Sequence, residues 1–220
     1  MMRVLGEMGF QQSYTYFTWR NEKQELTDYL RELSGVASAY MRPNFFTNTP
    51  DILHAYLQKS GPAGFAIRAT LAATMVPTYG VYSGFELYEG TPLREGSEEY
   101  LNTEKFQYRP RDWKAAEDEG RSLAPYLTTL NLIRRAHPAL QTLRGITFHD
   151  TNHSEVIAYS RRDHDDVVLT ICTLNPKMPA RATVQLNMPA LGLDWDAQYR
   201  ATDEVTGASW TWNREVYVEL

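Results

Sequence analysis

The chain has 220 residues, 43% of them hydrophobic and 22% charged, which is typical of one large or two small soluble domains. Its net charge of -5 and its lack of any membrane-length apolar run argue against nucleic acid and membranes as partners. The single cysteine, Cys172, excludes an internal disulfide framework, and its apolar neighbours predict a buried thiol. No signal pattern is present at the N-terminus, so we expect a cytoplasmic protein.

Strand-like and helix-like patterns alternate along the first two thirds of the chain, which predicts parallel βαβ units. The first helix has Asn21 as its predicted N-cap and Gly35 as its stop. Pro77 and Pro138 should end two later helices, because proline cannot continue a helix. The predicted elements are a strand at 11–19, a helix at 22–33, a strand at 39–46, a helix at 64–75, a strand at 79–82, an irregular stretch at about 86–120 and a helix at about 123–137.

After residue 142 the helical period disappears, and short strands alternate with turn residues. We therefore divide the chain into residues 1–142 and an all-β domain at 143–220, expected to be a small antiparallel β-sandwich. Three βα units are fewer than the eight units, in about 250 residues, of a closed (β/α)8 barrel. Either the first sheet is open or it is part of a larger structure. The predicted β strands are 156–160, 167–174, 182–188, 198–203, 209–213 and 215–220.

Aromatic residues make up 12% of the chain, and many have polar neighbours. Such rings suit a sugar-binding surface, although half-buried strand residues have the same composition. Phosphate loops and metal-ligand motifs are missing from the sequence, and the turn-rich setting of His149 and His153 argues against a metal site there. Two carboxylates, Asp51 and Glu86, follow predicted strands, where barrel enzymes place their active sites. Spacing alone favours a structural place for Asp51, in the first turn of a helix, where the helix dipole would stabilise it.

Four segments in the same order resemble the bacterial maltosyltransferases that use maltose 1-phosphate, within the α-amylase family of glycoside hydrolases and transferases. General amylases end the second of these segments in Asn-His-Asp, whereas this chain has Asn48-Thr49-Pro50-Asp51, the variant of the maltosyltransferases. The resemblance implies the C-terminal part of a (β/α)8 TIM barrel, strands 6 to 8, followed by the β domain. The segments are residues 10–30, 40–58, 76–90 and 101–113.

The same resemblance assigns roles to individual residues. Members of the family use three catalytic carboxylates, and Asp51 matches the third, which stabilises the transition state. The nucleophile and the acid/base lie before the helix that starts this chain, so we expect a C-terminal portion that is inactive alone. Lys105 matches a donor-binding lysine. Weaker sugar-binding candidates are Asn48, Phe106, Tyr16 and Tyr88.

Two further side chains could have structural roles instead of binding substrate. Arg42 could pair with a barrel carboxylate, and Glu86 is as well suited to fixing a loop as to touching substrate.

The implied partners are maltose 1-phosphate, an α-1,4-glucan such as glycogen and the remaining part of the enzyme, which we expect to be a homodimer as a whole. Neither a cofactor nor a metal is implied. The alternative is a non-catalytic module that binds α-glucan or serves as an assembly surface.

Overall fold

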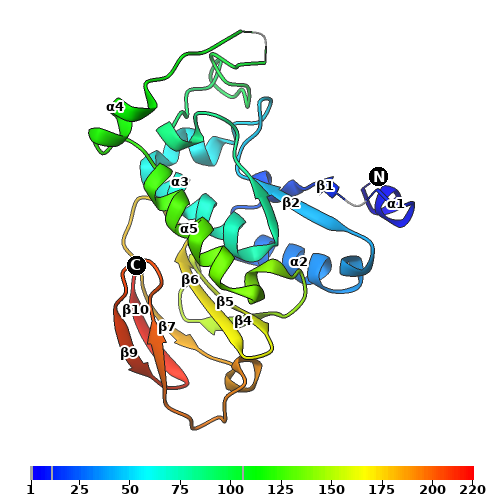
Figure 1. The fold of residues 1–220 in the computed structure, drawn as a ribbon, viewed down its shortest axis with the longest axis vertical. Coiled ribbons are helices and arrows are strands. Elements are labelled where there is room, and N and C mark those ends of the chain that lie inside the picture. The colour runs from blue at the N-terminus through cyan, green and yellow to red at the C-terminus, as the bar shows by residue number, and fades with distance from the viewer. Residues whose placement is uncertain (1, 11, 106) are drawn as a thin grey trace.

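Three parallel strands form the first sheet of the computed structural model, which describes residues 2–10, 12–105 and 107–220 (Figure 1). The sheet order is β1-β2-β3, and both neighbouring pairs run parallel. Helix α2 (Lys23–Ser34) connects β1 to β2, and α3 (Ala55–Met75) connects β2 to β3. The predicted βαβ units are therefore confirmed. The strands are β1 (Gln12–Tyr14), β2 (Arg42–Phe46) and β3 (Thr78–Gly80).

Several predicted boundaries of this first part are wrong. The predicted first strand is short and is followed by the 3₁₀ helix η1 (Tyr16–Trp19). The N-cap of α2 is Glu22 rather than Asn21, whose amide nitrogen instead donates to the Thr18 carbonyl at 3.4 Å. Helix α3 begins nine residues before the predicted start, and a kink with φ of 62° at Gly61 joins its two parts. Gly35 and Pro77 do mark the ends of α2 and α3.

The chain then runs through a long, mostly irregular segment to α5 (Ala124–Ala136), which ends immediately before His137 and Pro138. This segment forms the end of the molecule farthest from the C-terminal strands (Figure 1). None of the helices in the described ranges is long and apolar enough to cross a membrane. The short helices are α1 (Met2–Glu7), η2 (Val36–Ala39), η3 (Phe85–Leu87), α4 (Trp113–Asp118) and η4 (Pro138–Gln141).

The last part of the chain forms an antiparallel sheet of order β10-β7-β4-β5-β6 and a separate hairpin of β8 and β9. Strand β4 is not among the predicted strands, because its polar sequence ITFHDT resembles a turn-rich segment. Its pairing with β5 and β7 defines it as a strand. The elements are β4 (Ile146–Thr151), β5 (Val156–Asp163), β6 (Asp166–Thr173), β7 (Arg181–Gln185), η5 (Met188–Leu191), β8 (Tyr199–Thr202), β9 (Ser209–Trp212) and β10 (Glu215–Glu219).

Strand β5 is buried on both faces. Because each face packs against a different part of the molecule, this strand joins the two parts. Ile157 and Tyr159 pack in the same cluster as the apolar residues of α2, α3 and β2, and the Tyr159 hydroxyl lies 2.6 Å from Thr74 Oγ1. Ala158, on the opposite face, packs with β7 and β10. Cys172 is buried in the first cluster, as predicted, and burial raises the pKa of its thiol to about 12.

His149 on β4 is a buried histidine with both ring nitrogens engaged. Its Nδ1 accepts a hydrogen bond from the Asn187 backbone N–H at 3.1 Å, so Nε2 carries the proton toward Ser160 Oγ at 3.0 Å. Burial lowers the pKa of His149 from 6.5 to about 4, because the charged ring would lose its hydration. The side chain therefore supports the β sheet in its neutral form.

This pKa predicts that the His149→Asn variant loses part of the acid sensitivity of folding. Above pH 6.5 the histidine is neutral in both states, whereas between about pH 6.5 and 4 only the unfolded chain binds the proton. Stability from this group therefore falls as the pH falls, by up to about 1.4 kcal/mol per pH unit. Urea unfolding at pH 6.5 and 4.5 measures the difference. The exposed His164→Asn variant is the control, and equal acid sensitivity in all three proteins would contradict the prediction.

Candidate active site

Asp51 lies in the loop that follows β2, at the carboxyl end of the parallel strands, with its side chain 57% exposed. Thr49 shapes the loop, because its Oγ1 accepts hydrogen bonds from the backbone N–H of Asp51 at 3.2 Å and of Ile52 at 3.0 Å. Helix α3 starts only at Ala55, and its N-cap is His54, whose Nδ1 accepts from the Tyr56 N–H. The alternative placement of Asp51 in the first helical turn is therefore wrong.

Lys105 reaches Asp51 from the long irregular segment, and its Nζ donates a hydrogen bond to Asp51 Oδ1. That hydrogen bond is the main cause of a raised pKa of the Lys105 amine, so the ammonium form is favoured. Thr103 joins the two loops, because its Oγ1 accepts from the Lys105 backbone N–H at 3.2 Å and donates to the Pro50 carbonyl at 3.4 Å. Because an exposed ion pair adds little to stability, the main effect of this pair is to hold the Lys105 ammonium beside the Asp51 carboxylate.

Asn48 is fully buried beneath this loop, and its amide group is bonded entirely within the protein. Its Oδ1 accepts from the Tyr82 N–H at 2.8 Å and from Thr47 Oγ1 at 3.1 Å. Its Nδ2 donates to the Tyr100 hydroxyl at 2.5 Å and to the Tyr82 carbonyl at 3.5 Å. A side chain without exposed surface does not fit the sugar contact expected from the sequence. Asn48 instead fastens the loop after β2 to the segment after β3.

The aromatic candidates lie on three different segments. Tyr16 is exposed on η1 directly after β1, with its ring 6.1 Å from that of Trp19. Tyr88 is half-buried and adopts a positive φ of 56°; its ring meets that of Phe65 edge-on at 5.7 Å. Tyr88 also lines a small pocket of about 150 Å³ together with Tyr100, which is the partner of Asn48. Phe106 lies outside the described residues.

The two remaining candidates from the sequence have structural contacts. Glu86 accepts a hydrogen bond from the Gly84 N–H at 3.1 Å, so it fixes the turn at η3. Arg42 is exposed at the start of β2 and donates to the carbonyls of Ser38 and Met41, both at 2.9 Å. Among the described residues, Arg42 Nη1 thus bonds to carbonyl oxygens rather than to a carboxylate.

Some residues of this region have no signal in the sequence. Trp19 donates its indole N–H to both oxygens of Glu98 at 3.1 Å, and the Glu98 carbonyl accepts from the Leu53 N–H at 2.5 Å. These contacts connect the loop after β1, the loop after β2 and the irregular segment. Trp19 and Glu98 are 79 residues apart, so no local pattern could have paired them.

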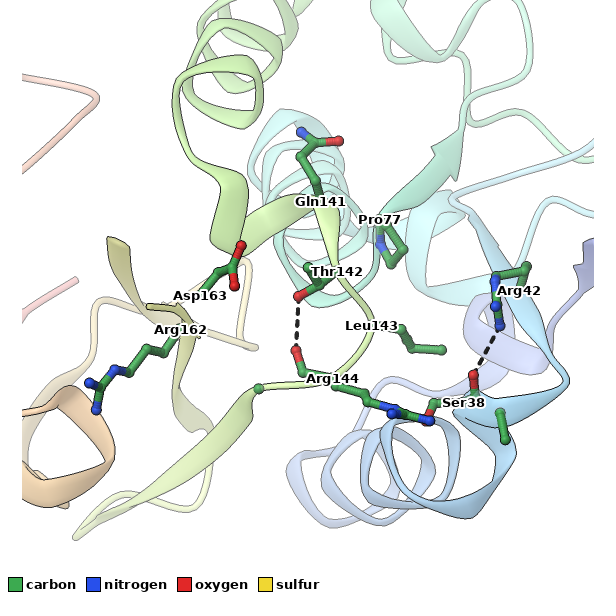
Figure 2. Close-up of a pocket in the computed structure, with 11 residues that line it drawn as sticks. Ser38, Arg42, Pro77, Gln141, Thr142, Leu143, Arg144, Arg162 and Asp163 are labelled. Atoms are coloured by element: carbon green, nitrogen blue, oxygen red, sulfur yellow. Dashed lines mark hydrogen bonds between the residues drawn. The ribbon is translucent and has the colours of Figure 1, made fainter. Parts of the chain in front are cut away.

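A pocket of about 560 Å³ lies at the opposite edge of the sheet, where β2 and β3 begin (Figure 2). Arg144 in its lining donates to Ser38 Oγ at 2.8 Å. Arg162 points away from it, toward the carbonyl of His164 (Figure 2). The arginine side chains are thus bonded within the protein, and none of the substrate or catalytic candidates that the structure describes lines this pocket. Asp51 and Lys105 therefore define the better candidate site.

Comparison with solved structures shows which known fold the chain has. A maltogenic α-amylase from Thermotoga neapolitana aligns with 97% of this chain and 49% of its own, with a TM-score of 0.67 at 12% sequence identity. An α-amylase from Geobacillus thermoleovorans aligns with 100% of this chain and 48% of its own, with a TM-score of 0.64 at 10% identity. The chain therefore has an α-amylase-like fold.

Sequence comparison is more specific. The chain is 60% identical, over all 220 residues, to alpha-1,4-glucan:maltose-1-phosphate maltosyltransferase 2 of Streptomyces coelicolor, and it covers 33% of that protein. It is 50% identical over 98% of its length to the Mycobacterium tuberculosis maltosyltransferase, covering 31% of it. A family model described as "GLGE, C-terminal" matches residues 148–220. These similarities confirm the resemblance to the maltosyltransferases, and the chain spans about a third of the length of these curated relatives.

Proposed function

We propose that this chain is the C-terminal part of a retaining maltosyltransferase that moves maltosyl units from maltose 1-phosphate to an α-1,4-glucan. The observation that carries the proposal is the pairing of Asp51 with Lys105 at the carboxyl end of β2, where the resemblance expects a catalytic carboxylate and a donor-binding lysine. High identity to proteins named as maltosyltransferases supports the substrate class.

The parallel strands fit a larger barrel in this proposal. Strands β1, β2 and β3 are strands 6, 7 and 8 of a (β/α)8 barrel within residues 1–142, and residues 143–220 form the C-terminal β domain. An α-amylase-like fold and the short three-stranded sheet support this arrangement. The remaining strands belong to an N-terminal portion, and we use "complete enzyme" below for residues 1–220 joined to that portion.

Asp51 acts on the transition state rather than as the attacking group. A carboxylate of the N-terminal portion attacks the anomeric carbon, the C1–O bond to phosphate breaks, and a second carboxyl group protonates the leaving oxygen. The glucan 4-hydroxyl, which gives its proton to the second carboxyl group now acting as a base, then attacks the anomeric carbon and displaces the enzyme carboxylate. Asp51 accepts hydrogen bonds from the sugar hydroxyls at carbons 2 and 3, which strengthen as positive charge develops on the ring. Lys105 holds the donor, next to Asp51.

The other residues of the site and the partners follow from the same proposal. Tyr16, Tyr88 and Phe106 offer rings to the bound sugar, and Asn48 holds the loop in place beneath Asp51. The complete enzyme works as a cytoplasmic homodimer and needs neither a cofactor nor a metal ion.

Phosphate release tests the proposed activity. The complete enzyme, incubated with maltose 1-phosphate and glycogen, should release phosphate and lengthen the glucan by two glucose units per event. Residues 1–220 alone should release none. Turnover by the isolated chain would contradict the division of catalytic groups, and no turnover by the complete enzyme would contradict the substrate assignment.

A second function, glucan binding without catalysis, is favoured by one observation in the C-terminal strands. Trp210 and Trp212 on β9 stack with their ring centroids 6.0 Å apart and their planes 18° apart, and Trp210 is about half exposed. Flat indole faces are suited to stacking on pyranose rings. Such binding would be a property of the isolated chain.

Retention of the isolated chain on immobilised amylose tests this second function. If the stacked pair binds glucan, the Trp210→Ala variant should lose most of the retention, because the exposed ring supplies the stacking face. Tyr217→Ala, which removes another exposed ring from β10, is the matched control. Equal retention of both variants and the unaltered chain, or no retention at all, would exclude a binding site at the stacked pair.

A further inference from the structure

Arg111 is an almost buried cation at the point where the irregular segment returns to the fold, with its side chain 4% exposed. Its Nε and Nη2 donate to the two oxygens of Glu89 at 2.8 and 3.0 Å, a bidentate pair. Its Nη1 lies 3.0 Å from Glu104 Oε2 and 3.2 Å from Ser83 Oγ. One guanidinium therefore joins Ser83, Glu89 and Glu104. These three residues are spread along the segment that leads from β3 to Lys105.

The turn at positions 83–89 is shaped around this ion pair. Gly84 has a φ of 95°, and a Cβ atom at that position would lie 2.1 Å from Glu89 Oε2. Only glycine fits both the backbone conformation and the space. Hydrogen bonds from Arg111, first to Glu89 and then to Glu104, raise the pKa of Arg111, and the same contact to Arg111 lowers the pKa of Glu104. Arg111 and Glu104 are therefore both charged at neutral pH.

Glu104 links the Arg111 side chain to the proposed site, because Glu104 immediately precedes Lys105. The Glu104 backbone N–H donates to the Tyr82 hydroxyl at 2.8 Å while its carboxylate is held by Arg111. Thr103, on the other side of Glu104, contacts both Lys105 and Pro50. The stretch from 103 to 105 is thus fixed by its side chains and its backbone, and the Lys105 ammonium lies at Asp51 as a result.

We propose that Arg111 is a positioning residue that acts through Glu104 to hold Lys105 against Asp51. It does not touch the substrate. Its consequence for catalysis rests on the proposed function, whereas its effect on the Lys105–Asp51 pair is a property of this chain. Lysine could not replace it, because a single ammonium group lacks the planar fork that serves Glu89 and Glu104 together.

The effect on the pair is tested by amine acylation of residues 1–220, with the labelling rate of each lysine measured by mass spectrometry. Lys105 should label slowly beside Asp51, and Asp51→Asn, which removes the charge of its partner, sets the rate for a broken pair. We expect Arg111→Met and Glu104→Gln to raise the Lys105 rate by about threefold to tenfold while leaving exposed Lys59 unchanged. Arg121→Met, which removes an exposed arginine that pairs with Glu119, is the control. Glu104→Gln keeps the Arg111–Glu89 pair, so it serves if Arg111→Met folds poorly.

The consequence for catalysis is tested by a double-mutant cycle in the complete enzyme. Arg111→Met and Lys105→Met should each raise KM for maltose 1-phosphate, and the double variant should be no worse than Lys105→Met alone. Additive effects would overturn the proposal, and so would a wild-type Lys105 labelling rate in both Arg111→Met and Glu104→Gln. If the complete enzyme has no activity while labelling changes as expected, the proposed function fails and the positioning role stands.

Discussion

Replacing Asp51 by alanine in the complete enzyme should lower kcat by about 100-fold to 1000-fold, equivalent to roughly 3–4 kcal/mol of transition-state stabilisation. The reason is that hydrogen bonds from the sugar hydroxyls to Asp51 strengthen as the ring becomes positively charged. Because the bound ground state gains less from them, KM should change much less than kcat. Initial rates of phosphate release over a range of maltose 1-phosphate concentrations measure both constants.

The control for this prediction is Asp28→Ala, which removes an exposed carboxylate on α2 that contacts Gln24 and Arg31. Its kcat should stay within about twofold of the unaltered enzyme, since surface substitutions away from the site change little. Because Asp51 is exposed and its ion pair adds little stability, Asp51→Ala should also keep the unfolding midpoint of the unaltered protein. An Asp51→Ala enzyme with more than about a tenth of the original kcat would contradict the proposed role.

The second large effect is expected for Asn48→Ala, which should lower the free energy of unfolding by about 2–4 kcal/mol. The truncated side chain leaves the Tyr82 backbone N–H, the Tyr82 carbonyl and the Tyr100 hydroxyl without their partner in a buried site. Each unsatisfied buried group costs about 1–3 kcal/mol, reduced where water can enter. Urea unfolding of residues 1–220, followed by circular dichroism, measures the change.

Asn131→Ala provides the comparison, because the Asn131 side chain accepts a hydrogen bond from the Tyr79 hydroxyl at 2.8 Å on an exposed part of α5. Its loss should cost less than about 1 kcal/mol. Equal stability of Asn48→Ala and Asn131→Ala would show that the buried network does not support the loop. A sugar-contacting Asn48 would instead lower activity and leave stability unchanged.

The order of elements could be predicted from the sequence because its signals are local. Gly35 and Pro77 mark helix ends through backbone properties that depend on one residue, and the change of hydrophobic period after residue 142 marks the start of the antiparallel strands. Strand β4 could not be predicted in this way, because its polar residues become a strand only by pairing with β5 and β7. The start of α3 at Ala55 could not be predicted either, because Gly61 and Pro62 interrupt the helical sequence pattern.

The candidate site is predictable at its centre and not in its surroundings. Asp51 and Lys105 stand in motifs that resemble a known family, and the structure brings them together. Their supports come from distant parts of the chain: Tyr100 is 52 residues from its partner Asn48, and Glu98 is 79 residues from Trp19. Such pairs follow from the packing of loops over the strand ends, which no local spacing encodes. Burial of Asn48 is likewise a tertiary property, so its side chain looks like a ligand contact in sequence alone.

In the proposed reaction, Asp51 assists a step whose attacking carboxylate lies outside residues 1–220. The most direct test is to locate the covalent intermediate: the complete enzyme is mixed with maltose 1-phosphate without acceptor, quenched in acid within the first turnover and digested for mass spectrometry. The maltosyl group should be found as an ester on a peptide from the N-terminal portion, with every peptide of residues 1–220 unmodified. A maltosyl ester on Asp51 would contradict this division of catalytic roles.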